Sequence, residues 1–384
     1  MVTRLVFGVF LRFCFMSEYT DFVNYDTMMS KIKKGYLMNS VMLIFLAFAF
    51  FYGIGNFIAL GLKDDDFKIL VLQAIFSVIA AIHPFVQGII YLLQSRRMFT
   101  LVHKYRDTCK NISGNTREFY RVQTLRQHFL QNFIAIDTAC GFIYHYVNRT
   151  NCFEDKDPRL VCGLFLPLWY PFVTNYFPVR EIIISIATLS FGHYCLYMIH
   201  APIDMFFMAE IFEFKVEQLI QLMRETSLNR SQNIDVVRRN FRRIVDYHQD
   251  IHECYLMVRE LAADLSALIL IGYVPFTAAL MVFLITDFNI AHLDEFFIII
   301  TNLYMWCTAM QKIFDMGDKL TEGAFEMDWY EMDNRMSKDF VIFFMKLHQP
   351  LKIKSLFFDL KKPILVSMMK TMYSTLMLIL NTNN

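Results

Sequence analysis

Residues 355–380 read SLFFDLKKPILVSMMKTMYSTLMLIL, and this stretch decides the fold that we expect for the chain. As a helix, residues 363–380 would be about 27 Å long, which is just enough to cross the hydrocarbon core of a bilayer. Yet the segment contains a lysine and several hydroxyl groups, and each unpaired polar group in hydrocarbon costs several kcal/mol. These polar residues are Ser367, Lys370, Thr371, Ser374 and Thr375.

The last segment should therefore face protein or water rather than lipid. The sequence leaves two alternatives open. In the first, the segment is the last helix of a bundle, and its hydroxyl groups form hydrogen bonds inside the protein. In the second, it lines a polar pathway between subunits.

The composition is that of an integral membrane protein. Of 384 residues, 56% are hydrophobic and 40 are phenylalanine, and long charge-free runs recur. A net charge of +1 gives no reason to expect nucleic-acid binding. The eight cysteines are scattered without a CxxC pair, so we expect neither a metal site nor a disulfide framework. Residues 1–15 contain Arg4 and Arg12 and no cleavage site follows, which indicates an interfacial segment rather than a signal peptide.

Six further charge-poor runs have the length of membrane-spanning helices. Two charged stretches have apolar residues at helical spacing and are expected to project into water as helices. One is residues 210–260, with a break near 226–233, and the other follows the sixth span to residue 351. The sequence thus predicts an all-α bundle of seven transmembrane helices with helical extensions. The first six spans lie at about residues 37–62, 69–94, 128–147, 181–205, 261–285 and 296–316.

Lysine and arginine residues near the spans predict the orientation of the bundle, because cytoplasmic loops carry an excess of them. They are concentrated before the first span and in residues 95–127, which follow the second span. We therefore expect the amino terminus in the cytoplasm. An odd number of spans then puts the carboxyl terminus outside, which is the reverse of a G-protein-coupled receptor.

The loop after the third span would lie outside the cell in this orientation. The sequon at Asn148 could then carry a glycan, whereas those at Asn111 and Asn229 would lie inside. Cys152 and Cys162 would face an oxidising compartment. The sequence leaves open whether these two cysteines form a disulfide bond.

The last third of the chain resembles the insect odorant receptor family. No motif is specific alone, but the set occurs in the order that the family has. A departure is KKPIL at residues 361–365, where the family usually has SLETF, and it alters the charge at the expected cytoplasmic mouth. The motifs are LYMWCTAM at 303–310 with Phe314 and Gly317, DWY at 328–330, QPLK at 349–352, FF at 357–358 with Leu360, and KT at 370–371 with Tyr373 and Ser374.

The resemblance implies a subunit of a ligand-gated, non-selective cation channel in the plasma membrane of a sensory neuron. Such receptors form tetramers, usually with a shared co-receptor subunit, and bind a small volatile or semi-volatile ligand. The domains would be a cytoplasmic amino-terminal segment at residues 1–36 and spans one to six with the ligand pocket at 37–316. Cytoplasmic anchor helices at 317–354 would follow, and then a pore-lining last span with a short extracellular tail at 355–384.

The resemblance also implies residues for the pore. Relative to Tyr373, Leu376 and Ile379 fall where the family has its hydrophobic gate, and Lys370 belongs to the same segment. Hydrophobic constrictions gate by dewetting, so apolar residues suit this role, although they would equally suit packing. The hydroxyl-bearing residues lie on a different face of the helix from Leu376 and Ile379. We favour Leu376 and Ile379 in the pore and the hydroxyl-bearing face against the next subunit.

Ligand-binding residues are expected in the outer halves of the second, third, fourth and sixth spans, in a mostly apolar pocket. Each candidate would otherwise be a core residue. Asp137 would receive an amine or bond an alcohol, and the alternative, which we prefer, is a structural residue paired with His83 or His193. The candidates are Phe76, Ile79, Ala80, His83, Asp137, Gly141, Tyr144, His145, Ile186, Ser190, Leu303, Trp306 and Cys307.

The sequence predicts neither an enzyme nor a cofactor, since no Ser-His-Asp, HExxH or phosphate-loop arrangement is present. His200 and Asp204 are one helical turn apart, but two ligands do not make a metal site. We expect an odorant receptor subunit. The alternatives are a gustatory-type receptor channel of the same architecture and, with less support, a secondary transporter, for which the expected internal repeats are lacking.

Overall fold

The computed structural model describes residues 176–226, 234–286, 290–355 and 358–382, three short pieces between residues 158 and 174, and scattered residues between 100 and 147. The first two predicted spans lie outside the described residues, together with Phe76, Ile79, Ala80 and His83. The same holds for Asp137, His145, Asn148, Cys152 and Cys162, so the predictions on these residues stay predictions.

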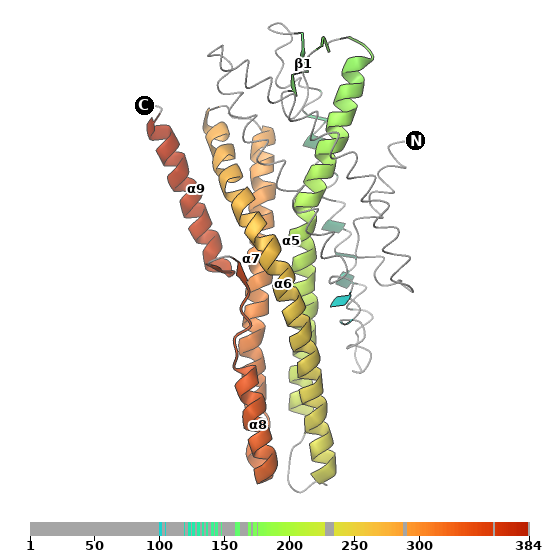
Figure 1. Ribbon diagram of the computed structural model, residues 1–384, viewed down its shortest axis with the longest axis vertical. Coiled ribbons are helices and arrows are strands. Elements are labelled where there is room, and N and C mark those ends of the chain that lie inside the picture. The colour runs from blue at the N-terminus through green and yellow to red at the C-terminus, as the bar shows by residue number, and fades with distance from the viewer. Residues whose placement is uncertain are drawn as a thin grey trace.

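Long helices form the body of the described structure (Figure 1). They are α5, Val179–Glu225; α6, Ile234–Thr286; and α7, Ile290–Phe325. The predicted break near residues 226–233 is confirmed, because α5 ends before it and α6 begins after it. Within the residues that the structure describes, no helix meets the combined requirements of length and apolarity for a membrane-spanning segment.

Short elements connect and follow the long helices. After α7 come the 3-10 helix η3, Trp329–Glu331, and helix α8, Asn334–Leu347. Strands β3, Lys354–Ser355, and β4, Phe358–Asp359, pair antiparallel and lead into α9, Lys362–Thr382. A second antiparallel pair, β1, Leu160–Val161, and β2, Leu168–Trp169, precedes α5. Apart from these two small strand pairs, the all-α prediction is confirmed for the described residues.

The helical stretch expected between the sixth span and residue 351 consists of more than one helix, and the chain reverses within it. α7 ends at Phe325, and α8 returns along it. The Thr321 hydroxyl donates a hydrogen bond to the Leu347 carbonyl at 3.3 Å, which brings the end of α8 back to the level of α7. The reversal lets α8 bury its own apolar stripe, which is Met336, Phe340, Phe343 and Leu347.

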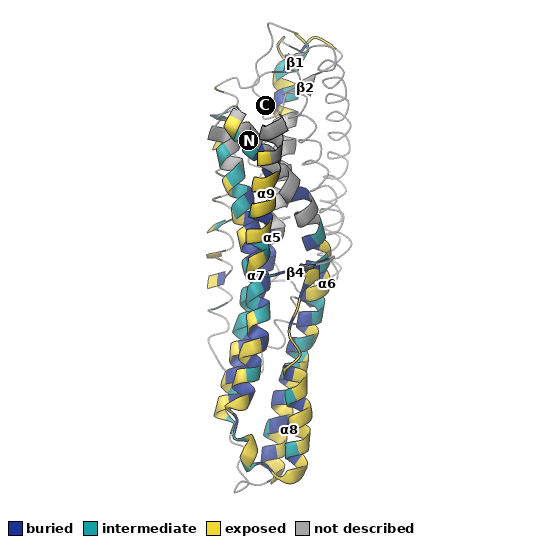
Figure 2. Cartoon of the chain, turned by 90° about the vertical axis from the view of Figure 1, so that its left-hand side faces the viewer, coloured by how far each residue is buried: buried dark blue, intermediate teal, exposed yellow. Residues whose placement is uncertain are grey.

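The core lies on the sides where the helices face each other, and exposed residues lie on the outer sides (Figure 2). α5 contacts both α7 and α6, and it has a buried apolar stripe whose members recur every three or four positions, as expected for one face of a helix. At Gly323 of α7, an added Cβ would lie 3.0 Å from Ile220 Cγ1 and 3.1 Å from its Cγ2. The two helices therefore approach closely because this position has no side chain. The stripe on α5 is Met205, Met208, Phe212, Val216, Leu219 and Met223.

An aromatic cluster lies between α6 and α8, at the end of the molecule that contains α8. Phe241 of α6 contacts Phe343 edge-on, with ring centroids 5.8 Å apart. His248, two turns further along α6, also meets Phe343 edge-on at 5.3 Å and lies 6.1 Å from His252. Burial lowers the pKa of the His248 imidazole to about 4, and the neighbouring His252 lowers it as well. His248 is therefore neutral in the folded protein at physiological pH.

A second apolar surface is not covered by the described structure. It consists of helical residues between 122 and 147, in the region of the third predicted span, and their side chains are 40% to 73% exposed. Their spacing of three, four or seven puts them on a single face of a helix. The residues are Val122, Leu125, Phe129, Phe133, Ile136, Ile143 and Val147.

Gly323→Val tests the close approach of α5 and α7. The new side chain would overpack against Ile220, whose β-branched side chain has little rotamer freedom, so we expect a loss of about 1–3 kcal/mol. Thermal unfolding of the purified receptor would measure this loss. Adding Ile220→Ala to the variant should recover part of it, whereas Glu322→Ala, on the exposed side of the same turn, should leave the melting temperature nearly unchanged. Equal melting temperatures for Gly323→Val and the native protein would contradict the proposed contact.

The pKa of His248 predicts a stability that depends on pH. Because the folded-state pKa of about 4 lies below the ordinary value of 6.5, stability is full above pH 6.5 and falls as the pH drops towards 4. At pH 5 the loss should be about 2 kcal/mol relative to pH 7. His248→Gln should unfold with a smaller difference between pH 7 and pH 5, and His348→Gln, on an exposed histidine, should behave like the native protein.

Candidate functional site

The segment before α9 is held against α6 and α7 by hydrogen bonds. The Tyr255 hydroxyl on α6 donates to the Lys352 carbonyl at 2.7 Å, and the Leu360 amide donates to the Ile353 carbonyl at 2.9 Å. The amide of Lys362 donates to Gln311 Oε1 on α7 at 3.3 Å. The start of α9 therefore has a defined position relative to both long helices.

The KKPIL departure is accommodated at this start. The Lys361 ammonium lies 3.3 Å from the centroid of the Phe314 ring on α7, a cation–π contact. Lys362 is exposed and begins the helix. Pro363 follows in the first turn, where its missing N–H has no intrahelical partner to lose. The altered charge is thus split between one lysine over an aromatic ring and one at the surface.

α9 has two chemically different faces. Met368 and Met372 are buried, and α9 contacts both α6 and α7. The hydroxyl-bearing face is turned away from these helices, and the Thr371 hydroxyl also donates to the Ser367 carbonyl within α9 at 3.0 Å. The polar side of the last helix thus faces outward from the chain's own bundle. Its exposed residues are Val366, Ser367, Lys370, Thr371, Tyr373 and Ser374.

The four predicted pore residues all belong to α9. Lys370 is exposed, and Tyr373 is 57% exposed. The side chains of Leu376 and Ile379 lie outside the part of the chain that the structure describes, so their predicted role as a gate stays a prediction.

The pocket candidates on α7 are packed in the core. Leu303, Trp306 and Cys307 are buried on one stretch of α7. The Trp306 Nε1–H donates to the Ser266 hydroxyl on α6 at 2.9 Å, so both polar groups are satisfied within the protein. The structure brings these residues together because they share a helix.

The pocket candidates on the third and fourth predicted spans are described less fully. Gly141 has open space on its Cβ side, with nothing within 4 Å. Tyr144 lies on the same helical stretch and is half-buried. Ile186 and Ser190 belong to α5, and their side chains lie outside the described part of the chain.

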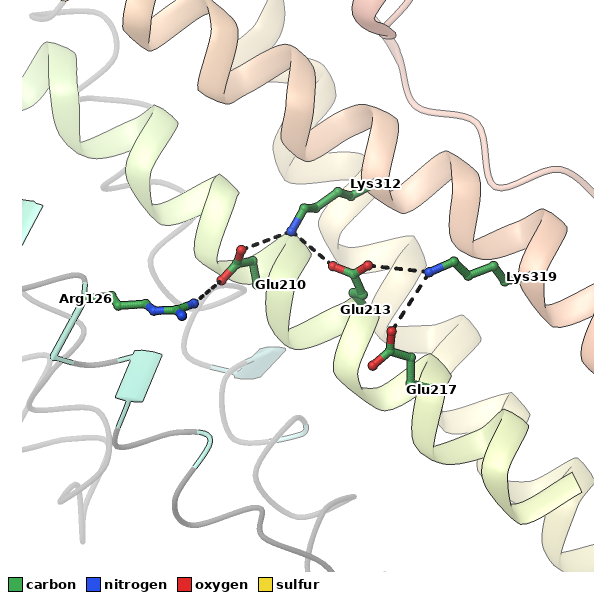
Figure 3. A network of polar contacts seen from close by, with 6 residues as sticks. All are labelled: Arg126, Glu210, Glu213, Glu217, Lys312 and Lys319. Carbon is green, nitrogen blue, oxygen red and sulfur yellow. Dashed lines mark hydrogen bonds and ion pairs between the residues drawn. The ribbon is translucent and has the colours of Figure 1, made fainter. Parts of the chain in front are cut away.

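A ladder of opposite charges joins α5 to α7 (Figure 3). The Lys312 ammonium lies 3.0 Å from Glu210 Oε1 and 3.0 Å from Glu213 Oε2. Lys319 lies 3.7 Å from Glu213 and 3.9 Å from Glu217, so Glu213 is shared by both lysines. The carboxylates follow one face of α5 and the lysines follow one face of α7. The ladder therefore fixes the axial register of the two helices.

The inner end of the ladder is the less exposed one. The side chains of Lys312 and Glu210 are 27% and 15% exposed, whereas those of Lys319 and Glu217 are 45% and 57% exposed. Lys312 also lies 5.2 Å from the Phe206 ring centroid. Arg126, from the basic stretch after the second predicted span, reaches Glu210 at 4.0 Å (Figure 3). Sequence reasoning missed this site, because its partners are far apart in the chain; the only available signal was the spacing of Glu210, Glu213 and Glu217.

Sequence reasoning also missed Asn302. This residue lies on α7 beside the candidate Leu303, is 2% exposed, and its amide Nδ2 has no hydrogen-bond partner among the described residues. Its signal in the sequence was an amide in the mostly apolar first half of the sixth predicted span.

The comparisons with known proteins give the family. The sequence model of the family described as 7tm Odorant receptor matches residues 69–373, which is most of the chain. The chain belongs to this family of seven-transmembrane odorant receptors. None of the curated proteins matches the sequence. The resemblance to odorant receptors that the motifs indicated is therefore confirmed.

Solved structures show the same fold. The insect olfactory receptor OR5 from Machilis hrabei is similar over 94% of this chain and 92% of its own, with a TM-score of 0.69 and 17% sequence identity. The structure of that receptor in complex with eugenol covers the same shares, with a TM-score of 0.67 and 15% identity. At this identity the likeness concerns the fold, and it confirms the predicted fold class. The predicted orientation of the termini stays a prediction.

Double-mutant cycles would test the ladder. Removing charges with Lys312→Gln and Glu210→Gln, singly and together, should give a coupling energy of about 1 kcal/mol or more, because both groups are largely shielded from water. The pair Lys319 and Glu217 should couple less. A useful control is Arg224 and Glu326, which approach to 2.6 Å but are 60% and 50% exposed. If that pair couples as strongly as Lys312 and Glu210, distance rather than burial decides the strength.

Proposed function

We propose that this chain is a subunit of an odorant-gated, non-selective cation channel in the plasma membrane, assembled as a tetramer with a co-receptor subunit. A small volatile or semi-volatile molecule is the ligand. Membership of the odorant receptor family supports a receptor rather than an enzyme. The fold shared with a receptor whose structure was determined with eugenol supports a small organic ligand.

The observation that carries the channel proposal is the outward polar face of α9. A helix with Ser367, Lys370 and Ser374 exposed on one side and Met372 buried on the other is unsuited to contact lipid on its polar side. Four copies around an axis would give that face water and protein as its surroundings. The internal hydrogen bond of Thr371 lowers the cost of its hydroxyl there.

The uncovered apolar face between residues 122 and 147 supports the membrane part of the proposal. A contiguous exposed apolar surface of this kind marks contact with a membrane or another protein. Lipid is the occupant we propose, because the apolar members of this face extend from residue 122 to residue 147, over most of the length of a membrane-spanning helix. The proposed orientation has the amino terminus in the cytoplasm and the carboxyl terminus outside.

Ligand binding would open the channel by favouring the open state, in proportion to its differential affinity for the two states. We propose that the ligand pocket lies among the second, third, fourth and sixth spans, and that it includes Leu303, Trp306 and Cys307. The charge ladder lies further along α5 and α7 than these pocket residues, and it links the two helices that such a pocket would contact.

Expression with the co-receptor tests the function directly. Odorants should evoke inward currents whose reversal potential follows the cation gradient and not the chloride gradient. Expression of the co-receptor alone is the control for its own currents. Uptake of a radiolabelled odorant without any current would instead favour a transporter.

The two faces of α9 can be compared by mutation. If Leu376 and Ile379 form the gate, Leu376→Ser or Ile379→Ser should hydrate the closed constriction and raise the current in the absence of ligand. Ser374→Leu, on the outward polar face, would then change assembly or surface expression more than it changes the leak current. The measurement is whole-cell leak current, normalised to surface expression. Leak that rises with Ser374→Leu and not with the other two variants would assign the pore to the polar face.

A further inference from the structure

Asn302 has an unpaired polar group inside the protein. The residue is 2% exposed, and its amide Nδ2 lacks a hydrogen-bond partner among the residues that the structure describes. A buried amide without a partner loses its hydrogen bonds to water and gains none in the protein. Folded proteins contain few such groups, and each one calls for an explanation. A hydrophobic residue of the same size would avoid this cost.

The described side chains one turn from Asn302 along α7 are apolar. Ile298 and Met305 lie one turn before and after it on α7, and Met305 packs with Ile203 and Phe207 of α5. Hydrocarbon side chains cannot accept a hydrogen bond from the amide. The unpaired group is therefore at the interface between α5 and α7, the helices that contain the fourth and sixth predicted spans.

Met305 gives this place an adaptable side chain. Met305 has an unbranched, flexible side chain, and methionines of this kind adapt to occupants of different shape. Trp306, which the proposed pocket includes, lies one turn after Asn302 on α7, and Leu303 is the next residue in sequence. A mostly apolar site with a single placed polar group is typical of small-molecule pockets, where the polar group fixes orientation.

We propose that Asn302 is the polar recognition group of the ligand site, and that it selects ligands with a hydrogen-bond-accepting oxygen, such as a carbonyl, an ether or a hydroxyl. The Nδ2–H donates to that oxygen, and the cost of the unpaired amide is relieved only when such a ligand is bound. A hydrocarbon of the same shape leaves the amide unpaired and binds more weakly. This inference rests on the proposed function as a ligand receptor.

Matched ligand pairs test the proposal by binding, without any need for current. The probes are methyl ketones with six to ten carbons and the corresponding 2-methyl-1-alkenes, in which a methylene group replaces the carbonyl oxygen. Binding to the purified full-length receptor is measured by the ligand-induced rise in melting temperature over a concentration series. The native protein should bind its best ketone at least about tenfold more tightly than the matched alkene.

Asn302→Leu should bring the ketone and the alkene to within about threefold of each other, because it removes the donor and keeps the volume. Asn240→Leu, on α6 and distant from the predicted spans, is the matched control and should retain the native preference. A ketone preference that persists in Asn302→Leu, or a native protein that never prefers the ketone, overturns the proposal.

Stability of the unliganded protein gives a second readout. If the amide is unpaired without ligand, Asn302→Leu should raise the melting temperature above that of the native protein. A fall would mean that the amide is paired in the empty receptor, for example with a buried water, and would overturn the proposal. Failure of the proposed function is distinguishable, since absence of odorant-evoked current with the co-receptor would leave both of these binding and stability results unaffected.

Discussion

The packing of α5 against α7 is the constraint on which the rest of the described structure depends. At Gly323 of α7 the two helices come close, because no side chain separates the α7 backbone from Ile220 of α5. Lys312, shared between Glu210 and Glu213, then fixes how far along each other the helices sit. Hydrophobic contact alone would tolerate sliding, whereas paired charges at helical spacing favour one register.

The register of α5 and α7 also sets the positions of Asn302 and of the start of α9. Met305 meets Ile203 and Phe207 at the same interface, so the unpaired amide of Asn302 lies between the same two helices. Gln311 of α7 accepts the hydrogen bond that starts α9. A change in how α5 and α7 pack would therefore reach the proposed ligand site and the proposed pore helix together. In the proposed receptor channel, a change in the packing of α5 and α7 would transmit ligand binding to the pore helix.

The outward polar face of α9 contrasts with the aromatic cluster around α8. At α8, Phe241, Phe343 and the neutral His248 are gathered inside, away from water. At α9, only the methionine face is inside, and the lysine and hydroxyl groups are left for a partner or for water. The exposed polar face of α9 is available to a partner or to water, which agrees with the proposed assembly.

The sequence by itself determined the helical class, the chain break near residues 226–233, and the family, because these follow from helical spacing, charge distribution and short ordered motifs. It also identified α9 as a helix with a polar side. Only the tertiary structure decided which side of α9 faces out, that α8 folds back, that Lys312 pairs with Glu210, and that Asn302 Nδ2 lacks a partner among the described residues. Each of these depends on residues that are distant in sequence and adjacent only after folding, and local periodicity contains no information on which distant group a side chain will meet.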